Sequence, residues 1–213
     1  MTQLVYEKLN PFPHLIVQNM YNDAELDLIW EELNFLTKPN KLLSPEIYGA
    51  VQNDDGSYST TAKALTLDYE YHRRELSNIL TVNRKLFTGG YLETFSKIAP
   101  HCRNANHADF DLTKVRYYQN GDHYDAHWDI TFEYIAFSYF YKEPKCFDGG
   151  ELFFPEYDYE FECKNNSMII IPSYVYHGVK KIIMSESKNF TGNGRYCITQ
   201  FTKKNYSSTD RYQ

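Results

Sequence analysis

Three short motifs in the chain place a histidine two residues before an aspartate: His107-Ala108-Asp109, His123-Tyr124-Asp125 and His127-Trp128-Asp129. Residues i and i+2 of a β-strand point to the same face, so each motif can offer an imidazole and a carboxylate to one metal ion. A second histidine from a distant strand would complete a two-histidine, one-carboxylate triad that leaves three coordination positions open. One such motif is weak evidence, because three occur in this chain.

Two features select the third motif. It ends a longer pattern in which aromatic, glycine, histidine and aspartate residues recur at fixed spacing: Tyr118-x-x-Gly121-x-x-Tyr124-x-x-His127-x-Asp129. Only one histidine, His177, lies downstream of it. His177 follows the apolar run Met168–Ile171 and a turn, which places it at the start of the next expected strand. We therefore predict that His127, Asp129 and His177 bind one ferrous iron and form the catalytic centre.

At this point the chain resembles the 2-oxoglutarate/Fe(II)-dependent dioxygenase superfamily, and within it the prolyl 4-hydroxylase-like group. The resemblance covers roughly Lys114 to Thr202, and more loosely the opening Pro11–His14 and the helix after it. Four segments that are typical of the group occur in order: Tyr118 to Asp129, Gly149-Gly150-Glu151-Leu152-Phe153-Phe154-Pro155, His177-Gly178-Val179 and Arg195–Thr199. The resemblance implies a double-stranded β-helix, or jelly roll.

The resemblance also implies an anchor for the distal carboxylate of 2-oxoglutarate on the last core strand, where Arg195 fits. Arginine stays charged and can bind a carboxylate through two hydrogen bonds. The chain departs from the group in that eighteen positions separate His177 from Arg195, about eight more than usual, which indicates an inserted loop over residues 185–194. Lys180 or Lys181 is the alternative anchor.

Tyr118 falls where members of the group place a tyrosine hydroxyl on the co-substrate; aromatic core packing is its other reading. Tyr139 and Tyr141 are further candidates for the same contact. His123 and Asp125 are either a pair beside the iron ligands or substrate, or a solvated pair. His107–Asp109 is interpreted as a polar approach to a strand, and the remaining histidines as structural or exposed.

The activity implied is hydroxylation of an unactivated C–H bond with release of succinate and CO₂. Fe(II), 2-oxoglutarate and O₂ are the expected cofactors and co-substrates, with L-ascorbate as an additional candidate. A prolyl residue of a peptide or protein is the expected substrate, and a free amino acid or other small metabolite is the alternative. Two other classes remain as rivals: a non-catalytic jelly-roll module that binds a metal or ligand, and a zinc hydrolase.

The elements that must position these residues follow an α+β order, with helices first and strands after. Residues 10–17 predict a turn and a short strand, and Asn22–Glu25 resembles a capping box at the start of a helix with an apolar stripe. A loop over 38–62, a helix from about Tyr71 to Phe87 and a shorter one around Tyr91–Ile98 are expected next.

After residue 108, short runs rich in Val, Ile, Tyr and Phe predict a sandwich or barrel. They are Phe110–Tyr118, His123–Asp129, Ile135–Tyr141, Gly150–Phe154, Tyr159–Cys163, Met168–Ile171, Gly178–Ile183 and Arg195–Thr202. We expect one dioxygenase domain over 1–213, with an N-terminal strand and supporting helices in 1–107 packed on one sheet, and a catalytic jelly-roll core in 108–205.

Composition limits the domain number, the partners and the cellular location that we expect. The 213 residues suit one domain, and the 17% aromatic content excludes disorder. A net charge of −6 argues against nucleic acid as a partner. The N-terminus does not resemble a signal peptide, and no apolar run is long enough for a membrane span. The four cysteines are too far apart to suggest a disulfide framework or a zinc knuckle. We therefore expect a reduced, cytoplasmic setting without a membrane partner.

Overall fold

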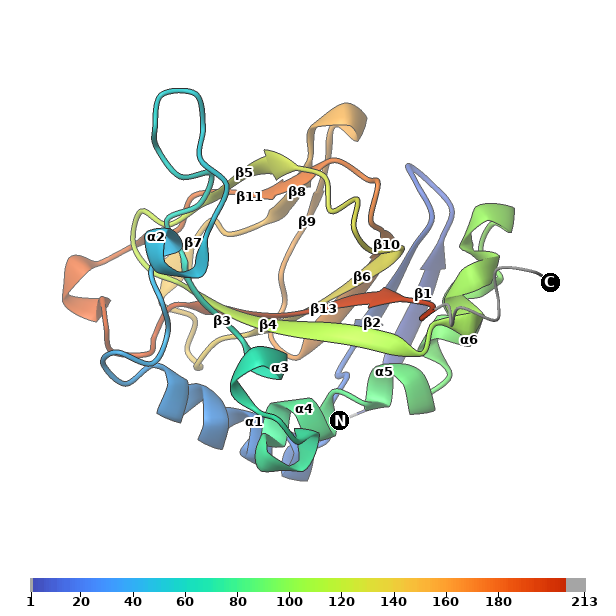
Figure 1. Ribbon diagram of the computed structural model, residues 1–213, viewed down its shortest axis with the longest axis horizontal. Helices are drawn as coiled ribbons and strands as arrows, with labels where there is room; N and C mark the ends of the chain where they lie inside the picture. The colour runs from blue at the N-terminus through green and yellow to red at the C-terminus, as the bar shows by residue number, and fades with distance from the viewer. Residues whose placement is uncertain (1, 206–213) are drawn as a thin grey trace.

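The computed structural model describes residues 2–205, so Met1 and residues 206–213 of the expected domain lie outside the described part. Two antiparallel sheets face each other across a central space (Figure 1). The larger sheet has the strand order β1-β2-β10-β6-β13-β4-β3. Its strands are β1 Leu4–Lys8, β2 His14–Gln18, β3 Lys63–Thr66, β4 Phe110–Tyr118, β6 Tyr134–Phe140, β10 Ser167–Pro172 and β13 Arg195–Lys203.

The smaller sheet has the order β5-β11-β8-β9, and a separate pair joins β12 to β7. The strands are β5 Tyr124–His127, β7 Phe147–Asp148, β8 Leu152–Phe154, β9 Tyr159–Phe161, β11 His177–Val179 and β12 Ile183–Met184. Each of the eight strand-like runs expected after residue 108 overlaps at least one strand of the structure. The predicted jelly roll, a double-stranded β-helix, is therefore confirmed.

Most helices cover the outer face of the larger sheet, below it in Figure 1, and leave the space between the sheets to strand side chains. They are α1 Asp23–Leu36, α3 Leu67–Glu70, α4 Asn78–Val82, α5 Lys85–Thr88 and α6 Tyr91–Ser96, with the 3-10 helices η1 Arg74–Leu76 and η2 Pro100–His107. The short helix α2 Pro45–Tyr48 lies above that sheet in Figure 1, near β3, and the 3-10 helices η3 Pro155–Tyr157 and η4 Glu186–Lys188 lie in loops between strands. The capping box at Asn22 and Glu25 forms as predicted. The α+β class with helices on one sheet is thus confirmed.

Strand alternation divides the apolar residues between two cores. Met168 and Ile170 of β10 pack with the helices, whereas Ile169 and Ile171 of the same strand point into the space between the sheets. On β13, Ile198 faces the helices and Cys197 faces inward. Because successive side chains point to opposite faces, alternate residues from Arg195 onward line the interior of the β-helix.

The continuous helix expected from about Tyr71 to Phe87 is wrong. That stretch forms three short helices, η1, α4 and α5, because buried polar groups hold its backbone in separate pieces. The side chain of Ser77 caps α4 by accepting a hydrogen bond from Leu80 N at 3.0 Å. The carboxylate of Glu32 on α1 accepts from Ile79 N at 2.7 Å. Strands β1 and β3 were not expected, and the region 38–62 contains the short helix α2.

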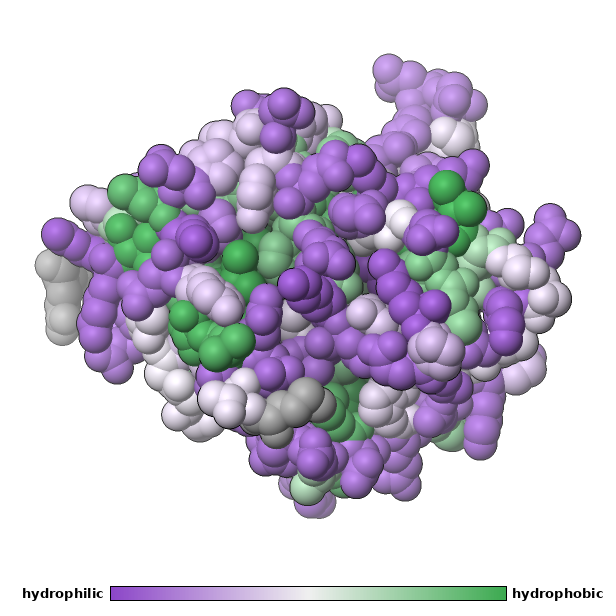
Figure 2. Space-filling view, turned by 180° about the vertical axis from the view of Figure 1, so that it is seen from behind, coloured by the Kyte–Doolittle hydropathy of each residue, from purple (hydrophilic) through white to green (hydrophobic). Residues whose placement is uncertain are grey.

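Seen from behind, the surface is mostly hydrophilic, and apolar side chains form small separate patches (Figure 2). Within residues 2–205, no helix combines the length and the apolar character needed to cross a membrane. The thiols of all four cysteines are free: Cys102, Cys163 and Cys197 are buried, and Cys146 is half-buried.

Candidate metal centre

His127 and His177 are brought together by the pairing of two short strands. β5 ends at His127, β11 begins at His177, and the two residues are register partners in the antiparallel pair. Their ring centroids are 4.7 Å apart. A histidine at the first position of a strand was the sequence prediction for His177, and the structure places it there, buried in the interior.

Asp129 lies beside the two histidines because of contacts that the sequence did not predict. It lies after the end of β5, in an irregular segment, so the expected strand over His123–Asp129 is too long. Its backbone N–H donates to Ser173 O at 3.2 Å, which ties the segment to the turn that precedes His177. The side chain therefore faces His127 because of a local turn and this hydrogen bond, not because of strand alternation.

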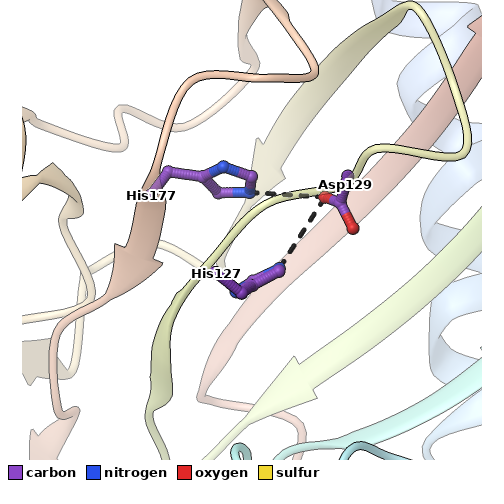
Figure 3. A group of neighbouring side chains, drawn as sticks. All are labelled: His127, Asp129 and His177. Carbon is purple, nitrogen blue, oxygen red and sulfur yellow. Dashed lines mark ion pairs between the residues drawn. The ribbon is translucent and has the colours of Figure 1, made fainter.

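The three side chains converge on one point (Figure 3). Asp129 Oδ2 is 3.7 Å from His127 Nε2 and 3.5 Å from His177 Nε2. One ligand atom from each of the three residues lies within 4.8 Å of the others. Within residues 2–205, no other group of three histidine, cysteine, aspartate or glutamate side chains converges in this way.

Backbone carbonyls fix the orientation of both imidazoles. The Nδ1 atom of His127 lies 2.9 Å from Asp125 O, and that of His177 lies 2.8 Å from Val175 O. Each Nδ1 therefore carries the proton, and each Nε2 presents its lone pair to the point shared with Asp129. A donor set of two imidazoles and one carboxylate suits iron(II), so the residues fit the metal that the motif implies.

The electrostatics of the site favour the protonation states that bind a metal. Burial, followed by the nearby His177, lowers the pKa of His127 to about 4. Burial alone would raise the pKa of Asp129, but hydrogen bonding and charge from His177, together with charge from His127 and Arg116, hold it below the ordinary value. A neutral imidazole and an ionised carboxylate need no deprotonation before they bind a metal.

The other two His-x-Asp motifs lie apart from this point. His123 Nε2 is 3.6 Å from Asp125 Oδ1, with side chains 34% and 48% exposed, and Asp125 also accepts from Asn53 Nδ2 at 3.1 Å. They form a solvated pair, the second of the two readings given above. His107 lies at the exposed end of η2, and Asp109 accepts from Asn205 N at 2.7 Å.

Arg195, at the start of β13, is 1% exposed and is the largest fully buried side chain among residues 2–205. Its guanidinium carbon lies 4.7 Å from the ring centroids of both Tyr118 and Tyr139. Nη2 donates to Cys163 Sγ at 3.4 Å, whereas Nε and Nη1 have no hydrogen-bond partner. Two buried donors without partners are costly unless a ligand satisfies them, and an anionic acceptor such as a carboxylate would form charge-assisted hydrogen bonds with the guanidinium.

The candidate tyrosines separate into two groups. Tyr118 and Tyr139 are fully buried beside Arg195, and the hydroxyl of Tyr139 has no hydrogen-bond partner. Tyr141 packs instead against Phe147 at 5.6 Å, away from Arg195. The extra residues before Arg195 form η4 and a loop, in which Asn189 Oδ1 accepts from Asn120 N at 3.2 Å. A loop at this position was predicted, and the structure shows one.

A narrow cavity of about 10 Å³ connects the two parts of the site. Its lining includes the three metal-binding candidates, Arg195, Tyr118 and five apolar or small polar side chains. It also includes Tyr124 and a second arginine, Arg116, which was not among the residues predicted from the sequence. Strand alternation could have found it, since Arg116 lies two residues before the inward-facing Tyr118 on β4.

Comparison with known proteins gives a consistent picture at the level of fold. No protein-family model and no curated protein sequence matches the chain. Among solved structures, a prolyl-4-hydroxylase from Pseudomonas putida is 12% identical with a TM-score of 0.57, over 91% of this chain and 93% of that one.

Two further structures are similar. A viral collagen prolyl hydroxylase from Paramecium Bursaria Chlorella virus-1, in complex with 2-oxoglutarate, is 12% identical with a TM-score of 0.54, over 89% of this chain and 94% of that one. A prolyl hydroxylase from Trichoplax adhaerens, in complex with a hypoxia inducible factor peptide fragment, is 14% identical with a TM-score of 0.55, over 90% and 83%. The chain therefore has the fold of 2-oxoglutarate/Fe(II) oxygenases of the prolyl hydroxylase-like group, as its motifs implied.

Proposed function

We propose that this protein is an Fe(II)- and 2-oxoglutarate-dependent dioxygenase that hydroxylates an unactivated C–H bond and releases succinate and CO₂. One observation carries the proposal: a convergent set of two histidines and one aspartate shares a narrow cavity with a buried arginine that has two unpaired donors. A jelly-roll module that only bound a small ligand would need neither the open triad nor the second group.

In this proposal His127, Asp129 and His177 hold the metal, and Arg195 binds the distal carboxylate of 2-oxoglutarate. Tyr139, whose buried hydroxyl is unpaired, donates to the same carboxylate, and Tyr118 supports the guanidinium from its other side. Iron(II), when bound to such a triad, supplies the activation of O₂ for C–H hydroxylation. L-ascorbate would act as a reductant that keeps the iron in its ferrous state.

The residues of the chain perform three tasks in this scheme. The carbonyls of Asp125 and Val175 keep both imidazoles oriented, so the metal site is organised before any ligand arrives. Arg195 fixes the far end of the co-substrate, which sets the distance between its oxo-acid end and the triad. Phe137, Leu152 and Val179 line the cavity and exclude water from the reacting centre.

For the substrate we propose a prolyl residue of a peptide or protein. The similar structures are prolyl hydroxylases, and one of them binds a peptide fragment. The rim near the triad exposes aromatic surface: the ring of Trp128 is 53% exposed and lies 4.2 Å from that of Tyr176. Flat, partly exposed aromatic rings suit contact with a peptide at low cost in side-chain entropy.

Succinate release tests the reaction class. Purified protein with Fe(II), 2-oxoglutarate and O₂ should form succinate slowly without substrate and faster with a proline-containing peptide pool, in which the product gains the mass of one oxygen. Asp129→Ala should abolish both. Absence of succinate under every condition would favour the binding module, and hydrolysis supported by zinc alone would favour the hydrolase.

A further inference from the structure

Arg116, the second arginine of the cavity, has no role in the proposed reaction. It lies on β4 opposite Cys197, is 6% exposed and has an unpaired Nε. Its Nη1 donates a hydrogen bond to Thr199 Oγ1 at 3.3 Å. Among the described residues, no carboxylate lies within 4.0 Å of its guanidinium. A permanently charged group has thus been buried with little compensation.

The guanidinium stands close to the metal centre. Its carbon lies 5.0 Å from the ring centroid of Tyr124, and the other neighbour of that ring is His127, stacked at 4.0 Å. The charge of Arg116 also lowers the pKa of Asp129. Arg195, by contrast, is held between Tyr118 and Tyr139. The cavity therefore contains two cationic positions, of which Arg116 is the one that neighbours the triad.

The charges of the loaded cavity do not balance without a further anion. The charged side chains that line it are Arg116, Arg195 and Asp129. The two positive charges of iron(II) offset the two negative charges of 2-oxoglutarate, and Asp129 offsets one arginine. One positive charge is left in a narrow, largely apolar space, where burial of an unpaired charge is strongly unfavourable.

We propose that Arg116 binds a carboxylate of the substrate, so that the protein hydroxylates a substrate whose target C–H bond lies a few bonds from an acidic group. This inference rests on the proposed function, because iron and 2-oxoglutarate enter the charge balance. The carboxylate could belong to a free amino acid such as proline or to an acidic side chain beside a prolyl residue. Both sources present the same group to Arg116.

Matched pairs that differ only in charge test the inference. Protein loaded with Mn(II), which does not turn over, and saturated with 2-oxoglutarate is titrated by calorimetry and thermal shift. The pairs are acetate and acetamide, L-proline and L-prolinamide, and the amides of N-acetyl-Pro-Glu and N-acetyl-Pro-Gln. The acid of at least the first pair should bind roughly 10- to 100-fold more tightly than its amide. The second and third pairs then distinguish a free acid from an acidic peptide.

Substitutions of Arg116 and Lys114 test which residue causes the preference for acids. Arg116→Gln should remove the preference for acids, Arg116→Lys should retain part of it, and Lys114→Gln, which neutralises a cation on the same strand outside the cavity lining, should change it by less than about threefold. Equal binding of acetate and acetamide by the unmodified protein, or a preference that persists in Arg116→Gln, would overturn the inference. Failure of the proposed function would give a different result. Binding of 2-oxoglutarate would then not depend on metal, whether or not the protein prefers the acid of each pair to the amide.

Discussion

Replacement of Arg195 by methionine separates a co-substrate anchor from a structural arginine. The variant keeps a long side chain but removes the charge and both unpaired donors, Nε and Nη1. A carboxylate that loses its buried, hydrogen-bonded cation costs about 2–5 kcal/mol of binding free energy. Taking about 3 kcal/mol, the dissociation constant of 2-oxoglutarate should rise about 150-fold.

The free energy of unfolding without ligand should respond much less. The two cation–π contacts with Tyr118 and Tyr139, at 4.7 Å each, are lost in Arg195→Met. Their loss is offset because the cost of burying an uncompensated charge disappears with them. We expect the two effects to leave the unfolding free energy within about 2 kcal/mol of that of the unmodified protein.

The assay combines two measurements on the same samples. Binding of 2-oxoglutarate to the Fe(II) protein is followed without O₂ by the visible charge-transfer absorption, and unfolding by urea without ligand. Arg195→Lys keeps the charge but loses the planar guanidinium. Its affinity for 2-oxoglutarate should lie between that of the unmodified protein and that of Arg195→Met. A variant that unfolds readily yet binds 2-oxoglutarate normally when folded would refute the assignment of Arg195 as anchor.

Three further predictions concern the surroundings of this site. Tyr139→Phe should leave stability unchanged or slightly higher, because the hydroxyl is unpaired, and should weaken 2-oxoglutarate by about 2- to 10-fold in the same titration. Gly150→Ala should lower the unfolding free energy by about 1–3 kcal/mol in urea, since φ is +76° and the added Cβ would lie 2.4 Å from Ile182 and 2.9 Å from Arg195 Cδ. Burial, with Arg116 nearby, lowers the pKa of Lys114 from 10.5 to about 8, so the unfolded chain holds more protons between these values. Stability should therefore rise with pH across that window by roughly 3 kcal/mol relative to Lys114→Met, and parallel pH profiles of the two proteins would contradict it.

The sequence predicted which three side chains converge better than it predicted how they are positioned. The spacing from Tyr118 to Asp129 selected the His-x-Asp motif that lies beside His177, and His177 begins a strand as expected. The physical reason given for Asp129 was wrong, however. Its position depends on a hydrogen bond to Ser173, forty-four residues away, and such a contact leaves no local pattern in the sequence.

Long-range polar contacts also explain why the helix expected after Tyr71 is interrupted. The stretch from Tyr71 to Phe87 has helical periodicity, but Glu32 and Ser77 capture its backbone, and only the fold brings them together. Strand β1 has five exposed residues and hence no apolar alternation to predict it. Alternation from Tyr118 predicts that Arg116 points inward. The residues next to it in the sequence, however, give no sign that a charged side chain would be buried there.

Anaerobic titration with Fe(II) tests the central claim, the iron site, most directly. The unmodified protein should bind one iron per chain, and His123→Ala, which alters a solvated histidine four residues before the proposed ligand, should do the same. His127→Ala should weaken iron binding by more than the 10- to 100-fold typical of a residue that only supports a ligand. Full iron occupancy in His127→Ala together with loss in His123→Ala would contradict the account.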